Sequence, residues 1–192
     1  MAAPRQRPHD TVEFIRLLGW IQGANSILEI GSRFGYPLVD MARACNVGAR
    51  VVAVDLPDAE GWSPPLNTLE HLQKNIKVLE DEGYGAHLIV GDSHDEEVIA
   101  RVEKLSPFDV VFIDGDHSYE GVCEDWLHYG RMGKKIIFHD IRRPVPPEDM
   151  SVEVWKLWEE IRMWANVKKE YPVEEFLAPG SKMGIGKIEW MI

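Results

Sequence analysis

Five short apolar segments, each ending at or beside an acidic residue or a glycine, constrain this chain more than any other feature. They are Ser26–Ile30, Arg50–Val54, Ala86–Val90, Phe108–Ile113 and Lys134–His139. Stretches with helical periodicity separate them, and no hairpin turn joins two of them directly. Strands that alternate with helices in this way favour a parallel sheet covered on both faces. The sequence therefore predicts an α/β fold with a doubly wound, mainly parallel sheet.

The segments between these strands carry apolar residues at helical spacing. The predicted helices are Thr11–Gln22, Tyr36–Cys45, Leu66–Leu79, Asp95–Leu105, Tyr119–Tyr129 and Ser151–Ala165. Asp10 and Glu13 have the spacing of a capping box for the first of these helices. Residues 174–178 and 183–192 can add antiparallel edge strands near the C-terminus. Because no linker, repeat or low-complexity tract interrupts the pattern, we expect one domain over residues 1–192.

Composition excludes several classes of partner. The chain has 21 basic and 32 acidic residues, a net charge of −11, and its basic residues do not cluster. A surface of this sign repels phosphate backbones and anionic membranes, so we expect no nucleic-acid partner and no membrane association. The polar start lacks the apolar stretch of a secretion signal. Two cysteines far apart in sequence are typical of reduced thiols, and we expect a cytoplasmic location.

We expect the functional site to lie at the carboxyl ends of the strands. In open parallel sheets, ligands bind outside the carboxyl ends of the strands, where loops and helix N-termini converge. The residues at these ends are Glu29 with Gly31, Asp55, Asp92, Asp114 with Asp116, and His139 with Asp140. Aspartate and glycine are also common in loops and at helix N-caps, so each position alone allows a structural role. Their repetition at all five ends predicts one shared pocket.

The turn after the first strand indicates a ligand without phosphates. Gly31 and Gly35 are four residues apart, and the dinucleotide fingerprint would need a glycine at Arg33 as well. Glu29 just before the turn would repel a pyrophosphate but attract an ammonium group. S-adenosylmethionine has an ammonium, a sulfonium and no phosphate.

The next two strand ends suit the nucleoside part of such a ligand. Asp55 can accept hydrogen bonds from both ribose hydroxyls. Asp92 with Ser93 suits the adenine end, where a carboxylate can accept from the exocyclic amine. The predicted cofactor-binding residues are thus Glu29, Gly31, Ser32, Gly35, Asp55, Asp92 and Ser93.

With these residues in view, the sequence resembles the class I S-adenosylmethionine-dependent methyltransferases, which have a Rossmann-like fold. The segments "LEIGSRFG", "VVAVDLP", "LIVGDS" and "FDVVFIDGDHSYEGVCEDW" stand in the expected order over about residues 26–140. The last segment resembles the small-molecule O-methyltransferases of the catechol, caffeoyl-CoA and macrolide-sugar types. That resemblance implies a divalent metal, Mg or Mn, held by Asp114, His139 and Asp140, with Asp116 or His117 near the substrate.

The residues themselves do not decide whether a metal is bound. If strand geometry continues past Ile113, Asp114 and Asp116 point to the same side. Two carboxylates ~4 Å apart would repel by ~4 kcal/mol at an effective dielectric of ~20, which a cation, a shared proton or solvation of splayed side chains can relieve. His139 stands where an acid is usual, and an imidazole suits Mn, Fe, Co or Zn better than Mg. It can equally be a hydrogen-bonded structural histidine.

The predicted activity is methyl transfer from S-adenosylmethionine to a hydroxyl of a small, sugar-like or polyhydroxylated acceptor, with Asp116 or His117 taking the proton. One alternative is a cofactor-binding module that is non-catalytic or dependent on a partner, because only about 25 residues precede the first strand. The other is an NAD-dependent oxidoreductase, since Asp55 also suits that cofactor. Structural roles are expected for Tyr119 and Asp125. Trp155, Trp158 and Ile161 share a helical face that belongs to the core or to a contact in a homo-oligomer.

Overall fold

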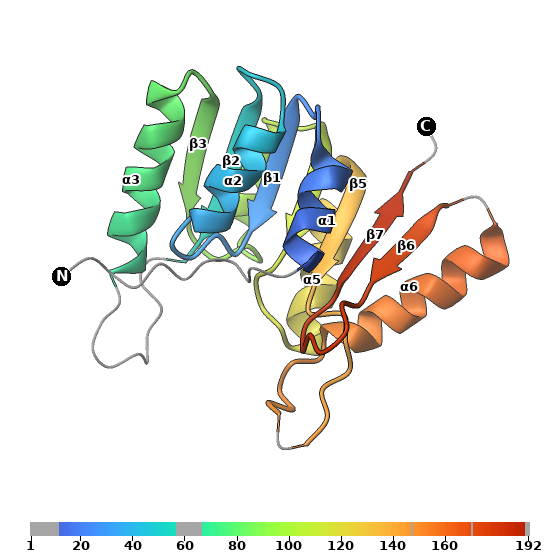
Figure 1. The fold of residues 1–192 in the computed structure, drawn as a ribbon. Coiled ribbons are helices and arrows are strands. Elements are labelled where there is room, and N and C mark those ends of the chain that lie inside the picture. The colour runs from blue at the N-terminus through green and yellow to red at the C-terminus, as the bar shows by residue number, and fades with distance from the viewer. Residues whose placement is uncertain (1–11, 57–66, 147, 170, 191–192) are drawn as a thin grey trace.

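One seven-stranded sheet organises the part of the chain that the computed structural model describes, residues 12–56, 67–146, 148–169 and 171–190 (Figure 1). The strands are β1 (Ser26–Ile30), β2 (Arg50–Asp55), β3 (Gly85–Val90), β4 (Phe108–Ile113), β5 (Gly133–His139), β6 (Val173–Phe176) and β7 (Ile185–Glu189). Their spatial order is β3-β2-β1-β4-β5-β7-β6. The first five pair in parallel, whereas β7 runs antiparallel to both β5 and β6. The predicted α/β fold and its antiparallel C-terminal edge are confirmed.

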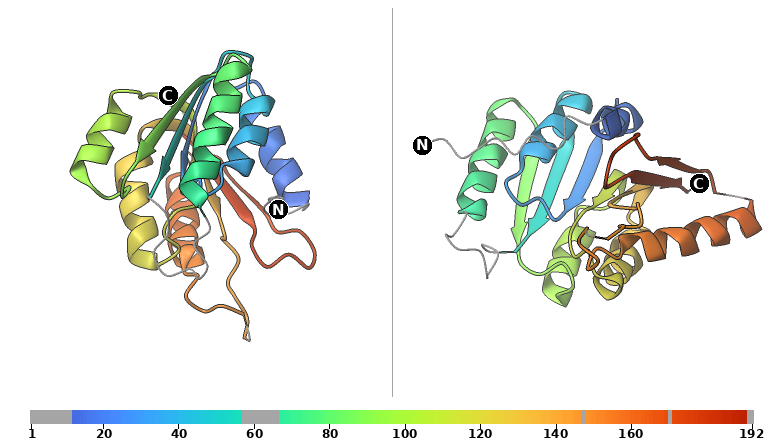
Figure 2. Two further views of the ribbon diagram at one scale, coloured as in Figure 1. Left: turned by 90° about the vertical axis from the view of Figure 1, so that its left-hand side faces the viewer. Right: turned by 60° about the horizontal axis from the view of Figure 1, so that its bottom comes forward.

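Helices cover both faces of the sheet, as the edge-on view in Figure 2 shows. They are α1 (Val12–Ile21), α2 (Tyr36–Ala44), α3 (Thr68–Asp81), α4 (Glu96–Glu103), α5 (Tyr119–Tyr129) and α6 (Val154–Lys168). Side chains of α1, α2 and α3 pack on one face of the sheet, and those of α4, α5 and α6 pack on the other. Strands β1, β2 and β4 are thus enclosed on both sides, which explains their apolar sequences, whereas β3 at the edge of the sheet is partly exposed.

The chain reverses its direction of travel across the sheet between β1 and β4. From β1 it moves outward to β2 and β3, and it then returns to pair β4 against β1 on the other side. Crevices at such a switch point, at the carboxyl ends of the strands, are the usual ligand sites of open α/β sheets. The fold therefore brings the predicted strand-end residues to one edge.

The C-terminal helix starts later than predicted, at Val154 instead of Ser151. The Ser151 hydroxyl and its N–H both donate to the Asp149 carboxylate, and the Glu153 N–H donates to the His117 carbonyl, so these residues form a turn. Trp158 and Ile161 are buried in the core. Of the other predictions, Asp10, the helix start at Thr11 and Leu66 lie outside the described residues. No helix among the described residues is long and apolar enough to cross a membrane.

Candidate functional site

A cleft of about 530 Å³ opens at the carboxyl ends of β1, β2, β3 and β4. A volume of this size is typical of small-molecule sites. Eight of the predicted site residues line it: Gly31, Ser32, Asp55, Asp92, Ser93, Asp114, Asp116 and His117. The expectation that the strand ends share one pocket therefore agrees with the geometry at four of the five strands. Glu29, Gly35, His139 and Asp140 lie outside the lining.

The turn after β1 is held between its two neighbouring strands. The N–H groups of Gly31 and Ser32 donate to the Val54 carbonyl at 2.9 and 3.4 Å. Gly31 has a φ of +86°, and a Cβ there would lie 2.2 Å from the Asp114 carbonyl oxygen. Only glycine allows this close approach, so the first glycine of the turn fixes the floor of the cleft between β1 and β4.

The residue that replaces the second glycine of the dinucleotide fingerprint takes a glycine-like conformation. Arg33 has a φ of +48°, and its N–H donates to the Asp55 carboxylate. Burial raises the pKa of Asp55, and hydrogen bonds from the N–H groups of Arg33 and Leu56 offset part of that effect. Asp55 therefore both holds the turn after β1 and lines the cleft.

Glu29 lies behind this turn, almost wholly buried at 1% exposure. Its Oε2 has no hydrogen-bond partner among the described residues. Burial raises its pKa to about 8, against a lowering contribution from Ser32, and the charges of Asp114 and Asp55 add to the increase. A buried carboxylate oxygen without a partner is costly for the fold and suits a cationic group that arrives with a ligand.

Gly35 has a role beside the cleft instead of in its wall. It is the N-cap of α2 in the left-handed conformation, with φ +75°. A Cβ there would lie 2.7 Å from Leu72 of α3, so Gly35 allows α2 and α3 to pack closely.

Four side chains from the loop after β4, the end of β5 and the residue after β5 form a compact acidic and imidazole cluster. Asp114 Oδ1 lies 3.2 Å from His117 Nε2 and 3.1 Å from His139 Nδ1. Asp140 Oδ2 lies 3.3 Å from His117 Nδ1 and 3.4 Å from His139 Nδ1. One ligand atom from each of Asp114, His117 and Asp140 lies within 4.8 Å of the other two. This trio can share one metal ion, whereas the sequence grouped Asp114 and Asp140 with His139.

Contacts within this cluster shift the pKa values of Asp114, His117 and His139. Burial alone would raise the pKa of Asp114, but the charges of His139 and His117 hold it well below its usual range. Burial would likewise lower the pKa of both histidines, yet the nearby carboxylates raise it. When no metal is bound, the two histidines can therefore compensate the negative charge of Asp114. This is an alternative to the bound cation that the sequence analysis considered.

Asp116 is turned away from this cluster. Its Oδ1 accepts the Ser118 N–H at 2.8 Å, and a Cβ at Gly121 would lie 2.3 Å from its Oδ2, so its carboxylate packs against the start of α5. Asp114 and Asp116 both line the cleft, but β4 ends at Ile113, so the strand geometry assumed from sequence does not continue and the two carboxylates have different partners.

Sequence reasoning gave no site role to several residues that line the cleft, among them Arg33, Phe34, Tyr36 and His94. Arg33, Phe34 and Tyr36 form part of its wall, with the Phe34 and Tyr36 rings stacked at 5.9 Å between centroids. His94 follows Asp92 and Ser93 at the end of β3 and also lines the cleft. The aromatic pair adjoining the glycine turn was a visible signal. His94 gave none, because its partners are distant in sequence.

A doubly wound sheet of this strand order defines a class I methyltransferase domain when one cleft combines a glycine turn, an acid placed for a ribose (Asp55) and an arginine in place of the second glycine of the dinucleotide fingerprint. The chain belongs to this family: the family described as "Methyltransferase domain" matches residues 28–141. That match confirms the resemblance drawn from the four sequence segments.

Solved structures share the fold at low sequence identity. An O-methyltransferase from Bacillus cereus, in complex with S-adenosylhomocysteine, is 22% identical with a TM-score of 0.64; the match covers 92% of this chain and 79% of that one. The O-methyltransferase TomG from Streptomyces achromogenes, in complex with S-adenosylmethionine, is 16% identical with a TM-score of 0.65, over 93% and 78% of the two chains. No curated protein matches the chain by sequence.

Proposed function

We propose that this protein transfers a methyl group from S-adenosylmethionine to a hydroxyl of a small molecule. The observation that carries the proposal is the cleft, which combines a glycine turn with the Asp55 carboxylate and has the buried, unpartnered Oε2 of Glu29 behind that turn. These groups suit a ribose and a cationic amino group and offer no cradle for a pyrophosphate. The cofactors in the Bacillus and Streptomyces structures support the same cofactor here.

The cofactor roles follow the strand order. Asp55 at the end of β2 accepts from the ribose hydroxyls, and Asp92 and Ser93 at the end of β3 face the adenine. Glu29 attracts the ammonium group from behind the turn. In this arrangement the transferring methyl lies between the turn after β1 and the acidic cluster after β4. Correct positioning of two reactants can supply ~7–11 kcal/mol of the barrier reduction.

The residues present fit a divalent metal at the acidic cluster. Asp114, His117 and Asp140 would hold it, and two carboxylates with one imidazole suit Mn, Fe or Zn better than Mg. A metal there would lower the pKa of an acceptor hydroxyl and stabilise its alkoxide. Asp140 has a φ of +57°, a sparsely populated conformation for a residue other than glycine, which is common at functional sites.

Without a metal, Asp116 or His117 takes the proton of the acceptor hydroxyl, because both line the cleft; with His117 on the metal, that role falls to Asp116. Adjacent hydroxyls can chelate a metal, so we propose a sugar-like or polyhydroxylated acceptor.

Ligand selectivity tests the cofactor directly. We expect isothermal titration calorimetry to show S-adenosylhomocysteine binding and no binding of NAD. Asp55→Ala should weaken S-adenosylhomocysteine binding about 10- to 100-fold, since two hydrogen bonds of roughly 1 kcal/mol each are lost along with the contact that holds Arg33. Asp95→Ala, at the N-cap of α4 outside the cleft, is the control and should leave the affinity unchanged. NAD binding in place of S-adenosylhomocysteine would support the oxidoreductase alternative instead.

Metal binding distinguishes the two possible ligand sets. We expect Asp114→Asn and His117→Ala each to weaken Mn²⁺ binding at least 10-fold, measured by electron paramagnetic resonance of free Mn²⁺. Asp116→Asn should change it less than 3-fold, because that carboxylate packs against α5. Loss of Mn²⁺ binding in His139→Ala but not in His117→Ala would instead support the ligand set inferred from the sequence, Asp114, His139 and Asp140. Absence of Mn²⁺ binding to the wild type at millimolar concentration would contradict the metal proposal.

Turnover separates an enzyme from a binding module. We expect methylation of a hydroxylated acceptor in a broad screen with Mg²⁺ and Mn²⁺ supplied. Binding of S-adenosylhomocysteine without any turnover across that screen would favour the non-catalytic or partner-dependent alternative.

A further inference from the structure

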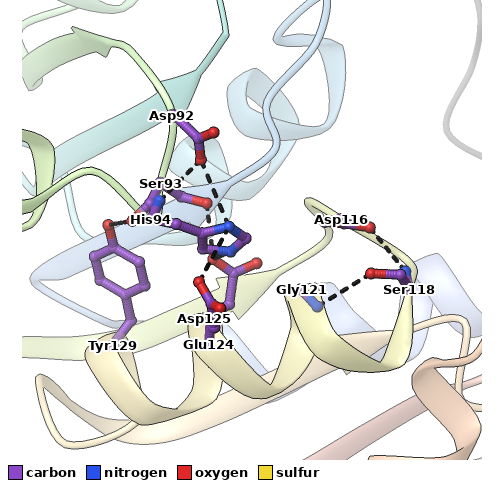
Figure 3. Close-up of polar contacts among 9 residues, drawn as sticks. All are labelled: Asp92, Ser93, His94, Asp116, Ser118, Gly121, Glu124, Asp125 and Tyr129. Atoms are coloured by element: carbon purple, nitrogen blue, oxygen red, sulfur yellow. Dashed lines mark hydrogen bonds and ion pairs between the residues drawn. The ribbon is translucent and has the colours of Figure 1, made fainter.

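A buried carboxylate beneath the cleft belongs to none of the roles above. Asp125 lies on α5 with 0% of its surface exposed, and it does not line the cleft. Figure 3 shows it between the helix and the turn after β3. Burial raises its pKa to about 6, although a hydrogen bond from the Ser93 hydroxyl and the proximity of His94 act in the opposite direction. Burial of a carboxylic acid in this way costs folding stability, which suggests that Asp125 has a functional role.

Asp125 holds the turn that forms the β3 end of the cleft. Its Oδ1 accepts from the Ser93 hydroxyl at 2.8 Å and lies 3.2 Å from His94 Nε2 (Figure 3). One turn further along α5, the Tyr129 hydroxyl donates to the Ser93 carbonyl at 2.5 Å. The side chain and the backbone of Ser93 are therefore both fixed from α5.

The ring of His94 is placed by acids on both sides. Its Nδ1 lies 3.6 Å from Asp92 on the turn and 3.6 Å from Glu124 on α5, while its Nε2 faces Asp125. The Asp92 Oδ1 also accepts the His94 N–H at 2.9 Å. Rotation of this turn would break several of these contacts together, which makes its position in the cleft well defined.

The second oxygen of Asp125 lies against another loop of the cleft. Oδ2 has no hydrogen-bond partner among the described residues, and a Cβ at Gly115 would lie 3.1 Å from it. Gly115 follows Asp114 and lines the cleft. Asp125 thus lies behind two loops that enclose the same end of the cleft, the one after β3 and the one after β4.

We infer that Asp125 is a positioning residue that holds Ser93 and His94 against the adenine base and so determines selectivity for adenine over other purines. The inference rests on the proposed cofactor. Selectivity for a base depends on donors and acceptors held to within a few tenths of an ångström, because a mispaired polar group in a closed site is costly. Asp125 acts through Ser93 and His94 and does not contact the cofactor itself.

The test compares two ligands that differ only in the base. S-adenosylhomocysteine and S-inosylhomocysteine, in which an oxygen replaces the exocyclic amine, are titrated calorimetrically into the full chain. We expect the wild type to prefer the adenine ligand at least 10-fold. Asp125→Ala should reduce that preference to less than 3-fold, mainly by weakening the adenine ligand. Asp125→Asn keeps an acceptor for Ser93 and should restore most of the preference.

Two further variants keep the test decisive. Glu120→Gln, at an exposed position in the first turn of the same helix, is the matched control and should leave the preference within 2-fold of the wild type. Tyr129→Phe removes only the bond to the Ser93 carbonyl and should reduce the preference partially, even if Asp125→Ala does not fold. Equal weakening of both ligands in Asp125→Ala, with the preference intact, would mean a merely structural role and overturn the inference. A wild type that binds neither ligand would instead overturn the proposed function.

Discussion

Replacing Gly31 with alanine is expected to abolish cofactor binding and to lower the midpoint of thermal unfolding by roughly 5–15 °C. The new Cβ would lie 2.2 Å from the Asp114 carbonyl oxygen, so β1 and β4 must separate at the floor of the cleft. Backbone strain at φ +86° costs about 1–2 kcal/mol, and overpacking against a rigid backbone costs about 1–3 kcal/mol more. Each kcal/mol lowers the midpoint by roughly 2–4 °C in a chain of this length.

Gly83→Ala separates the two contributions. Gly83 has a φ of +90°, but a Cβ there meets no atom within 4 Å among the described residues. This variant therefore shares the backbone strain and lacks the collision, and it should lower the midpoint by only a few degrees while binding S-adenosylhomocysteine normally. Differential scanning fluorimetry and calorimetry on both variants check this. Equal effects of the two substitutions would contradict the close packing of the turn on β4.

Replacing Glu29 with glutamine is expected to stabilise the ligand-free protein at high pH and to weaken cofactor binding. Burial raises the pKa of Glu29 from 4.5 to about 8, so the folded state resists losing this proton. As pH rises from about 4.5 to about 8, the unfolded state ionises first and the wild type loses up to about 1.4 kcal/mol of stability per pH unit. Glutamine cannot ionise and avoids this loss. The variant should match the wild type near pH 5 and unfold at a temperature several degrees higher at pH 8.

The same substitution should weaken S-adenosylhomocysteine binding at least 10-fold at pH 8, because the charge that attracts the ammonium is gone. Wild-type affinity should rise as pH approaches 8 and Glu29 ionises, whereas the variant should lack that rise. Glu13→Gln is the control: Glu13 is also buried, but it bonds to Ala178 and Ser181, far from the cleft in the fold. A Glu29→Gln protein that binds the cofactor as well as the wild type would exclude Glu29 from cofactor binding.

The positions of the strand ends could be predicted from sequence because they depend on local patterns. Each buried strand is a short apolar run, and in a parallel sheet the run's carboxyl end must point to the common edge. Asp55 and Asp114 follow such a run directly, and Asp92 follows one after a single glycine, so their convergence on one cleft required no knowledge of side-chain packing.

The arrangement of the histidines could not be predicted in this way. Strand alternation places neighbouring residues on opposite faces, but the φ of +57° at Asp140 breaks that alternation just after β5. His139 and Asp140 therefore both approach Asp114 or His117, and His117 joins the trio that can hold an ion. A backbone conformation of this kind, at a residue other than glycine, leaves no clear signal in sequence.

Contacts between segments distant in the chain could not be predicted from the sequence either. Ser93 and Asp125 are 32 residues apart, and their hydrogen bond depends on how α5 packs beneath the turn after β3. The burial of Glu29 likewise results from the packing of β1 between β2 and β4. The sequence indicated a structural role for Asp125, and only the packing shows which part of the cleft it supports.

A crystal structure of the protein grown with saturating S-adenosylhomocysteine tests the central claim most directly. The ribose is predicted to lie against Asp55, the adenine beside Ser93, and the amino group on the side of the glycine turn nearest Glu29. Clear density for the ligand on another surface, or an empty cleft in crystals of protein that binds the ligand in solution, would contradict the account.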